Sequence, residues 1–276
     1  YVLMFGKLGF PALGTVGCGY ATSIVIWLQF LLLVLDIHMH RHYRPFALMS
    51  YVEAPDWQKL WSLLKVGVPI AIAIFVEGSL FVGAALLIGR LGPVAAAAHL
   101  IAINFSALMF MIPVGLSSAI SIRVGNAIGR QEPEAARYAG MIGVAIVLGF
   151  QTMSAAAMFL FPGLIVSIYT SDAVVAPLAV SLLFYAAIFQ YPDGLQMVAA
   201  GALRGYKDTR MPMVYMIISF WIVGMTLGYN LTFNRGMGPA GMWVGMIAGL
   251  TVAAGLMLRR FNHTSRKLVQ DSGRGG

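Results

Sequence analysis

Seven runs of apolar residues alternate with short polar segments along the chain. They cover approximately residues 17–37, 66–89, 96–122, 139–161, 178–203, 212–233 and 240–258. The hydrocarbon core of a bilayer is about 30 Å thick, so a helix that crosses it needs about 20 apolar residues. We therefore predict an all-α fold, a polytopic membrane bundle of seven transmembrane helices joined by short loops.

The composition agrees with this prediction and narrows the class of protein. Hydrophobic residues make up 59% of the chain and charged residues 10%, and the mean hydropathy of +0.83 is far above that of a soluble domain. The single cysteine, Cys18, excludes an intrachain disulfide framework. The predicted spans contain no His-rich metal cluster and no Ser/His/Asp set, so we expect neither an enzyme nor a bound cofactor.

Positive residues gather on one side of the predicted bundle. Of the 18 Lys and Arg, all except Lys7, Arg90 and Arg235 fall in the loops after the first, third and fifth helices or in the C-terminal tail. Since Lys and Arg are retained in cytoplasmic loops, this pattern predicts a multi-pass protein of the plasma (inner) membrane with a cytoplasmic C-terminus. The net charge of +8 then faces anionic lipid headgroups, and we expect no nucleic-acid partner.

Two segments outside the spans hold many of the polar residues. Residues 38–65 are predicted to be a cytoplasmic linker followed by an amphipathic segment that contains Trp57 and Trp61, and residues 259–276 a basic cytoplasmic tail. The linker also contains His38, His40 and His42. A solvated loop is the interpretation that we favour for these histidines, and a metal site is the alternative.

A short pattern recurs near the two ends of the chain. Pro11 stands before the first helix with Gly17 six residues later, and Pro239 and Gly245 stand in the same relation to the seventh helix. Six helices separate the two copies, as in a transporter built from parallel repeats. We then expect residues 1–37 to end a first lobe whose other helices are missing from this chain, and residues 66–258 to form a complete six-helix second lobe. A chance match is the alternative in a chain with 31 Gly and 12 Pro.

Glu77 interrupts the second apolar run close to its middle. It follows Pro69 by about 8 residues, or about 12 Å along a helix that rises 1.5 Å per residue. An acid near the bilayer centre costs about 3 kcal/mol on insertion scales, so it should face water, a ligand or a polar partner. A functional acid is the interpretation that we favour, and a protonated Glu bonded to a neighbouring helix is the alternative.

Asp193 is harder to place because it lies between Pro192 and Gly194, and Pro-Asp-Gly is also a turn signal. We favour one long helix that is capped at Ser171 or Asp172 and bent at Pro192, which would act as a hinge. Asp193 would then be a buried site residue. A turn at the membrane edge is the alternative.

A few polar and aromatic side chains accompany the two acids. Hard cations such as Na⁺ prefer oxygen ligands, and a carboxylate shielded from water can hold a proton instead, so either ion could neutralise Glu77 and Asp193. Apart from Na⁺ at these acids we expect no metal. Flat organic cations could bind to aromatic faces and methionines, although packing or lipid contact is the commoner role of any single such residue. The supporting polar candidates are Asn104, Gln190, Gln196 and Tyr185, and the candidate substrate-lining residues are Phe81, Phe110, Phe189 and Met197.

Two motifs, "LRGYKDT" at residues 203–209 and "RVGNAIG" at residues 123–129, stand in the predicted loops after the fifth and third helices. Together with the acids Glu77 and Asp193 they resemble the multidrug and toxic compound extrusion (MATE) transporters, in particular the NorM-type branch. The resemblance covers nearly the whole chain and implies an antiporter of twelve helices in two lobes, with Glu77 and Asp193 in the cation site of the second lobe. Phe110 and Phe189 stand where Tyr is common in NorM-like members, so we expect no hydroxyl ligand from these positions.

These features predict secondary active multidrug efflux, in which cationic or amphiphilic compounds leave in antiport with Na⁺ or H⁺ through buried carboxylates. Drug and ion would compete for acids that are costly to leave charged and dry. A flippase for a lipid-linked precursor, of related architecture, is the main alternative. It would show a larger basic cavity, whereas nearly every Lys and Arg here is predicted in a loop. A seven-helix receptor or channel is a more distant alternative.

Overall fold

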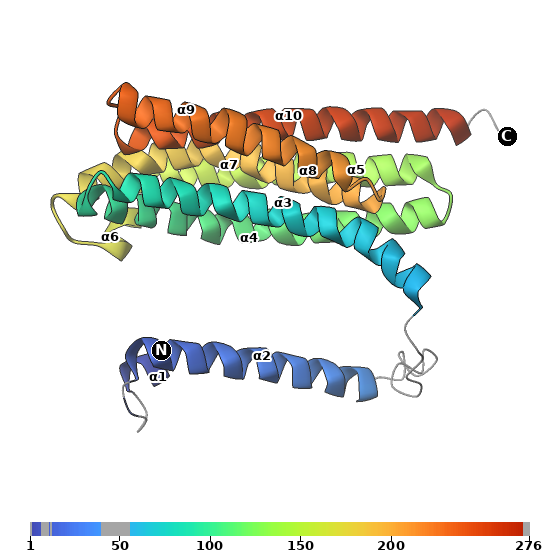
Figure 1. The fold of residues 1–276 in the computed structure, drawn as a ribbon, viewed down its shortest axis with the longest axis horizontal. Coiled ribbons are helices and arrows are strands. Elements are labelled where there is room, and N and C mark those ends of the chain that lie inside the picture. Colours follow the sequence, from blue (N-terminus) through green and yellow to red (C-terminus); the bar gives the residue numbers. More distant parts are fainter. Residues whose placement is uncertain (1, 7–10, 12, 40–55, 273–276) are drawn as a thin grey trace. The chain divides into compact units, whose positions relative to one another are not determined.

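The computed structural model describes residues 2–6, 11, 13–39 and 56–272 of the chain. Within these ranges the chain is almost entirely helical, without strands, and it divides into two compact units, Tyr1–Trp57 and Gln58–Gly276 (Figure 1). Among the described residues, seven helical stretches are long and apolar enough to cross a membrane. The predicted all-α bundle of seven membrane helices is therefore confirmed.

The first unit contains the short helix α1 (Val2–Phe5) and the first membrane-length helix, α2 (Gly14–Met39). They meet where α2 begins: the backbone nitrogen of Leu13 donates to the carbonyl of Leu3 at 3.1 Å, and a side chain at Gly17 would overlap the same carbonyl. The last turn of α2 carries an exposed His38, whereas His40 and His42 lie outside the described residues. The interpretation of this histidine segment therefore stays a prediction.

The second unit is a bundle of six membrane-length stretches. They are α3 (Trp57–Gly89), α4 (Pro93–Gly129), α5 (Pro133–Leu160), α7 (Val175–Gly205), the composite stretch Arg210–Asn234 and α10 (Pro239–Ser272), with the short α6 (Pro162–Tyr169) between α5 and α7. Several of these helices begin at a proline, which is favoured at the first helical position because its missing N–H has no partner there in any case.

Several helices extend beyond the ranges expected from hydropathy. α3 begins at Trp57 rather than near residue 66, so the end of the predicted linker is already helical, and α10 continues through the basic segment to Ser272. α4 ends at Gly129 rather than near residue 122, so the prediction that the motif at residues 123–129 lies in a loop is wrong. Hydropathy identifies the part of a helix that is apolar enough to lie in the hydrocarbon core of a bilayer. Polar residues can continue the same helix into water. The helical ends were therefore not visible in the apolar pattern.

α7 occupies the centre of the bundle, where it packs against α4, α5 and α10 (Figure 1). Small residues permit this arrangement, because a side chain at Gly201 would collide with the backbone of Ser117 on α4. Close backbone approach is a principal source of helix association in membranes, where lipid is as apolar as the helix surface. Asp193, on α7, is thus carried on a helix that other helices cover on several sides.

The composite stretch combines α8 (Arg210–Ile217), η2 (Ile218–Met225), α9 (Thr226–Tyr229) and η3 (Asn230–Asn234), of which η2 and η3 are π-helical. π turns are rare and are usually held in place by a specific local contact. In this chain the backbone of the stretch lies directly against α10, where a side chain at Gly245 would overlap Gly228.

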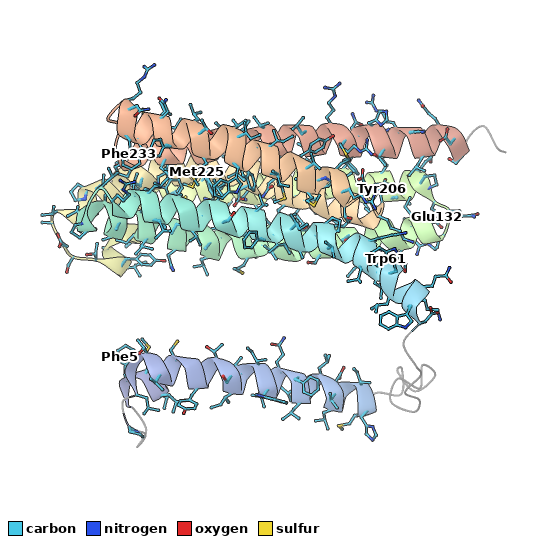
Figure 2. All side chains as sticks on the ribbon, viewed as in Figure 1. Phe5, Trp61, Glu132, Tyr206, Met225 and Phe233 are labelled. Carbon is cyan, nitrogen blue, oxygen red and sulfur yellow. The ribbon has the colours of Figure 1, made fainter. Side chains whose placement is uncertain are left out.

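α3 stands apart from this closely packed group. Among the described segments, no helix packs its backbone extensively along α3. The contacts between α3 and the neighbouring helices are made mainly by side chains. Met225 of η2 (Figure 2) reaches Gly83. Trp221 Nε1 donates a hydrogen bond to Ser79 Oγ at 3.2 Å. The space between α3 and α7 receives the polar side chains described next.

Candidate functional site

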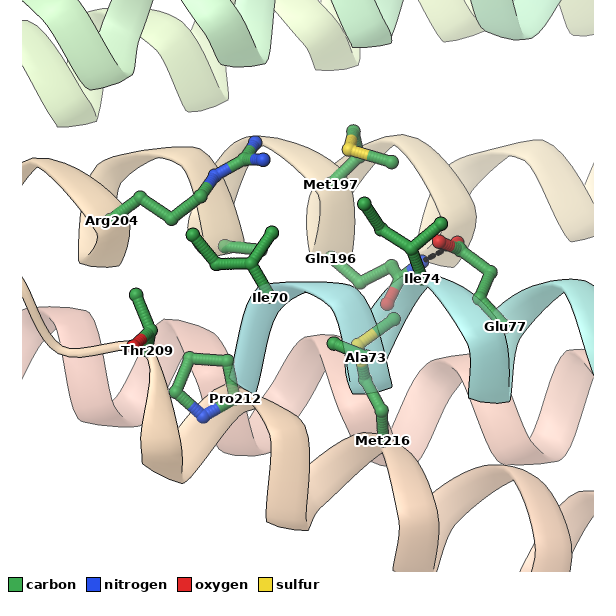
Figure 3. A pocket seen from close by; sticks show the side chains of 11 residues that line it. Ile70, Ala73, Ile74, Glu77, Gln196, Met197, Arg204, Thr209, Pro212 and Met216 are labelled. Atoms are coloured by element: carbon green, nitrogen blue, oxygen red, sulfur yellow. Dashed lines mark hydrogen bonds between the residues drawn. The ribbon is translucent and has the colours of Figure 1, made fainter. Parts of the chain in front are cut away.

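The two predicted acids meet across the space between α3 and α7. Glu77 and Asp193 line one cavity of about 400 Å³, and Asp193 is only 4% exposed. Gln196, one turn after Asp193, donates from Nε2 to Glu77 Oε1 at 2.7 Å (Figure 3). Because both acids line the same cavity, a cation bound there would reduce the repulsion between their negative charges.

Asp193 lies inside a continuous helix, so the alternative of a turn at the membrane edge is wrong. α7 runs from Val175 to Gly205 with Pro192 in its interior. A proline removes one helical hydrogen bond but need not end the helix when neighbouring helices support it. Asp172 caps the start, as predicted, because its Oδ1 accepts from the backbone nitrogens of Val174 at 2.7 Å and Val175 at 3.2 Å.

Two buried oxygens at this site lack partners in the described part of the chain. They are Asp193 Oδ1 and Gln196 Oε1. A buried polar atom without a hydrogen bond costs about 1–3 kcal/mol, and native structures keep few of them. Carboxylate and amide oxygens are the ligands that hard cations prefer, so these atoms with Glu77 are suited to Na⁺ or to a shared proton.

The wall beside the acids is aromatic. Phe81, Phe110 and Phe189 line the cavity, and the rings of Phe81 and Phe189 meet edge to face with centroids 5.9 Å apart. Phe189 is only 1% exposed because it also packs against Trp243, at 5.5 Å between centroids. Trp243 supports this wall from α10, a contribution that its place in an ordinary apolar run did not reveal.

A second, narrower cavity of about 50 Å³ leads from Glu77 toward the end of α7 (Figure 3). Met197 lines this cavity rather than the aromatic one, and Arg204 lies at its far end. The expectation that Arg204 belongs to a loop is wrong, because Arg204 is part of the last turn of α7. Its place in a polar motif after an apolar run had suggested a loop.

Three of the predicted supporting residues lie elsewhere. Asn104 is exposed and accepts a hydrogen bond from Tyr169 Oη at 3.2 Å, and Gln190 bonds to side chains of α5. Tyr185 is half-buried and lines neither of the two cavities. Helical spacing identifies the face of one helix but not the neighbour that this face meets, which explains these three outcomes.

The "LRGYKDT" motif builds the turn between α7 and α8. Arg204 reaches into the narrow cavity, Thr209 lines it, and Tyr206 packs against Phe261 of α10 with centroids 6.2 Å apart. Asp208 accepts a hydrogen bond from Arg260 Nε at 2.8 Å, which ties the turn to α10. The motif therefore holds three helices together beside the cavity.

No cluster of three or more His, Cys, Asp or Glu side chains suited to a transition metal occurs among the residues that the structure describes. Glu77 and Asp193 offer only two carboxylates, with the amide of Gln196 between them. Carboxylate and amide oxygens are the ligands of hard cations, so this set is chemically able to accept such an ion.

Comparison with known proteins adds a family and a fold. The MatE family model matches residues 69–230. A probable multidrug resistance protein NorM of Xanthomonas axonopodis pv. citri is 50% identical over 269 residues, which are 98% of this chain and 59% of that protein. The multidrug resistance protein PmpM of Pseudomonas aeruginosa is 41% identical over 274 residues, with 98% and 57% covered.

Solved structures agree in fold. The eukaryotic MATE transporter AtDTX14 matches with a TM-score of 0.81 at 21% identity, over 98% of this chain and 61% of that one. An outward-facing multidrug resistance MATE family transporter of the MOP superfamily matches with a TM-score of 0.83 at 19% identity, over 98% and 59%. The chain thus spans about three-fifths of the length of these relatives.

Proposed function

The chain belongs to the MatE family, the multidrug and toxic compound extrusion transporters that its motifs resemble, and from this membership we propose that the complete encoded protein exports organic cations or amphiphilic compounds in antiport with Na⁺ or H⁺. Membership places the chain among multi-pass membrane transporters rather than enzymes.

One observation carries the proposal: Glu77 and Asp193 come from different helices and meet at a single cavity with an aromatic wall. The acids supply negative charge at membrane depth, where it has to be neutralised. Phe81 and Phe110 supply apolar and π-electron surface, to which flat organic cations bind. A cavity of about 400 Å³ has room for a small organic molecule, whereas an ion alone needs far less.

The proposed mechanism is competition for the acids. With a coupling cation bound, the pair is neutralised and an organic cation binds weakly. With the organic cation bound, its charge replaces that of the ion. Such competition drives transport when the two ligands prefer different conformations of the complete protein. Pro192 lies in α7 directly before Asp193, and we propose it as the hinge between these conformations.

We further propose that the protein lies in the plasma membrane with its C-terminus in the cytoplasm. The uneven distribution of Lys and Arg along the chain supports this orientation. An engineered cysteine, Asp271→Cys in a Cys18→Ser background, should react with a membrane-impermeant maleimide in inverted vesicles and not in intact cells. Labelling in intact cells would contradict this orientation.

The flippase alternative receives less support. A carrier of lipid-linked precursors needs several basic side chains for the phosphates of its substrate. In the described chain, Arg204 is the one basic residue among those that line the two cavities at Glu77.

The proposal is tested by ethidium efflux from proteoliposomes that contain the complete protein under an imposed Na⁺ or pH gradient. Glu77→Gln and Asp193→Asn should each slow ion-driven efflux by about 10- to 100-fold, since removal of a charged ligand is worth about 1.5–3 kcal/mol. Glu134→Gln, an exposed acid in the first turn of α5, is the matched control and should behave as wild type. Wild-type coupling in both site variants would refute the proposed function.

A further inference from the structure

Arg204 brings a positive charge into the part of the protein that holds the two acids. It lies in the last turn of α7, two turns after Gln196, and it lines the same narrow cavity as Glu77 and Gln196 (Figure 3). The charges of Arg204 and Glu77 are close enough to interact, although no ion pair joins them directly. The efflux mechanism proposed above assigns no role to this residue.

The guanidinium of Arg204 is fixed in place rather than free to extend into water. Arg204 Nη2 donates to Ser117 Oγ at 2.7 Å, and Ser117 Oγ in turn donates to the backbone carbonyl of Met197 at 2.7 Å. Ser117 can reach this position because Gly201 has no side chain to obstruct it. Two helices therefore hold the positive charge at one end of the cavity.

The residues next to Arg204 do not neutralise the charge of its guanidinium. Arg204 Nε is buried and has no hydrogen-bond partner within the described residues. Asp208, the nearest acid along the chain, is bonded to Arg260 at 2.8 Å. Burial raises the pKa of Tyr206 to about 12, although the nearby Arg137 lowers it, so this phenol stays neutral. Glu77, which lines the same cavity, remains as the negative charge that Arg204 can balance directly.

We propose that Arg204 is the fixed counter-charge of the acid pair, so that Glu77 and Asp193 together bind one monovalent cation rather than two. Two ionised carboxylates and one guanidinium leave a single negative charge. Uncompensated charge is unfavourable in a low-dielectric interior, so the number of bound cations follows the net charge of the site. The inference rests on the proposed function, because it concerns the ions that this site exchanges for substrate.

The test counts cations on the purified complete protein. Radioactive Na⁺ bound at saturation is measured by equilibrium dialysis, and protons taken up on Na⁺ removal are counted with an indicator dye. Arg204→Gln should raise the number of bound cations about twofold, because both acids then need neutralising. Arg204→Lys keeps the charge and should bind the wild-type number. Arg210→Gln removes an exposed arginine from the start of α8 and serves as control, again with the wild-type number expected.

A merely structural role for Arg204 gives a different result. Should Arg204→Gln fold poorly, Asp193→Asn with Arg204→Gln restores the net charge of the site and should recover both folding and the wild-type number of cations. The proposal that Arg204 is the counter-charge is overturned if folded Arg204→Gln binds the wild-type number of cations. It is also overturned if the double variant stays unfolded. A wild-type protein that binds neither Na⁺ nor protons at Glu77 and Asp193 refutes the proposed function itself.

Discussion

Two glutamines on α7 show how the same side chain can serve two purposes in one membrane helix. Gln190 faces α5, where its Oε1 accepts a hydrogen bond from Ser154 at 2.9 Å and its Nε2 donates to Met158 Sδ at 2.9 Å. Gln196 faces α3, where its Nε2 donates to Glu77 and its Oε1 has no partner in the described structure. The first glutamine belongs to a closed cluster and the second to an open site.

The two glutamines differ in whether the protein itself supplies all of their hydrogen-bond partners. In the closed cluster, formed by Gln190, Ser154 and Met158, the protein itself satisfies both ends of the amide, and no charge is present. In the open site, formed by Glu77, Asp193 and Gln196, acidic and amide oxygens border a cavity without enough donors. Unsatisfied buried oxygens are costly, and a bound cation removes that cost.

The largest effect is expected from an acid placed in the closed cluster. Gln190→Glu loses the donor to Met158 and puts a carboxylate where residue 190 is only 2% exposed and lines no described cavity. The expected loss of stability is about 3 kcal/mol or more, because no cation can reach the site. The measurement is the midpoint of thermal unfolding in detergent, with Glu134→Gln as control. A wild-type midpoint, insensitive to Na⁺, would contradict the distinction between the two regions.

Removing each amide in turn should separate stability from ion dependence. Gln196→Leu removes the unpartnered Oε1 that borders the cavity with the two acids, together with the donor to Glu77, so cations should bind only at about tenfold higher concentration, equivalent to about 1.4 kcal/mol. Gln190→Leu should leave the ion dependence unchanged and cost about 1–2 kcal/mol of stability, because Ser154 loses its partner.

The two readouts are the Na⁺ or H⁺ dependence of ethidium efflux and thermal unfolding, measured on both variants. Unchanged or tighter cation binding in Gln196→Leu would contradict the role of Gln196 Oε1 as a cation ligand. If both variants change the same readout, the two regions do not differ as described.

Asp193→Leu should make the protein more stable while it abolishes coupling. Asp193 carries an unpartnered buried oxygen, and replacement of such a group by an apolar side chain is often neutral or stabilising, here by about 1 kcal/mol. The comparison is thermal unfolding without Na⁺, measured beside ion-driven efflux. A large loss of stability would show that Asp193 is needed for packing, like Gln190.

The smallest effect concerns the two phenylalanines that stand where tyrosine was expected. Phe110 is half-buried and lines the cavity, so Phe110→Tyr adds a hydroxyl that can reach a bound cation, and we expect about threefold tighter Na⁺ dependence, or about 0.7 kcal/mol. Phe189 is enclosed by Phe81 and Trp243. Phe189→Tyr should therefore lower the stability by up to about 1 kcal/mol and leave the affinity for Na⁺ unchanged. If both variants bound Na⁺ equally more tightly, the inference that only residue 110 can reach a bound cation would be wrong.

The apolar pattern was sufficient to predict the seven membrane helices, because spanning oil requires a run of apolar residues whatever the tertiary structure. It did not predict the start of α3 at Trp57 or the end of α10 at Ser272, since amphipathic and charged residues extend these helices beyond the apolar run. Glu77 and Asp193 were recognisable as site candidates because charge at membrane depth is too costly to be incidental. Their roles in transport stay a proposal.

The order of the residues was enough to predict seven membrane-length helices and to single out Glu77 and Asp193 as acids that are costly to leave charged among apolar residues, since both follow from the cost of moving charge and peptide groups into lipid. Only the tertiary structure decided that Asp193 is inside a helix rather than in a turn, that Gln196 and not Gln190 meets Glu77, and that Arg204 lines the cavity. These facts depend on which helix faces meet. Glycines such as Gly201 set that choice by permitting close contacts between residues that are distant in the sequence.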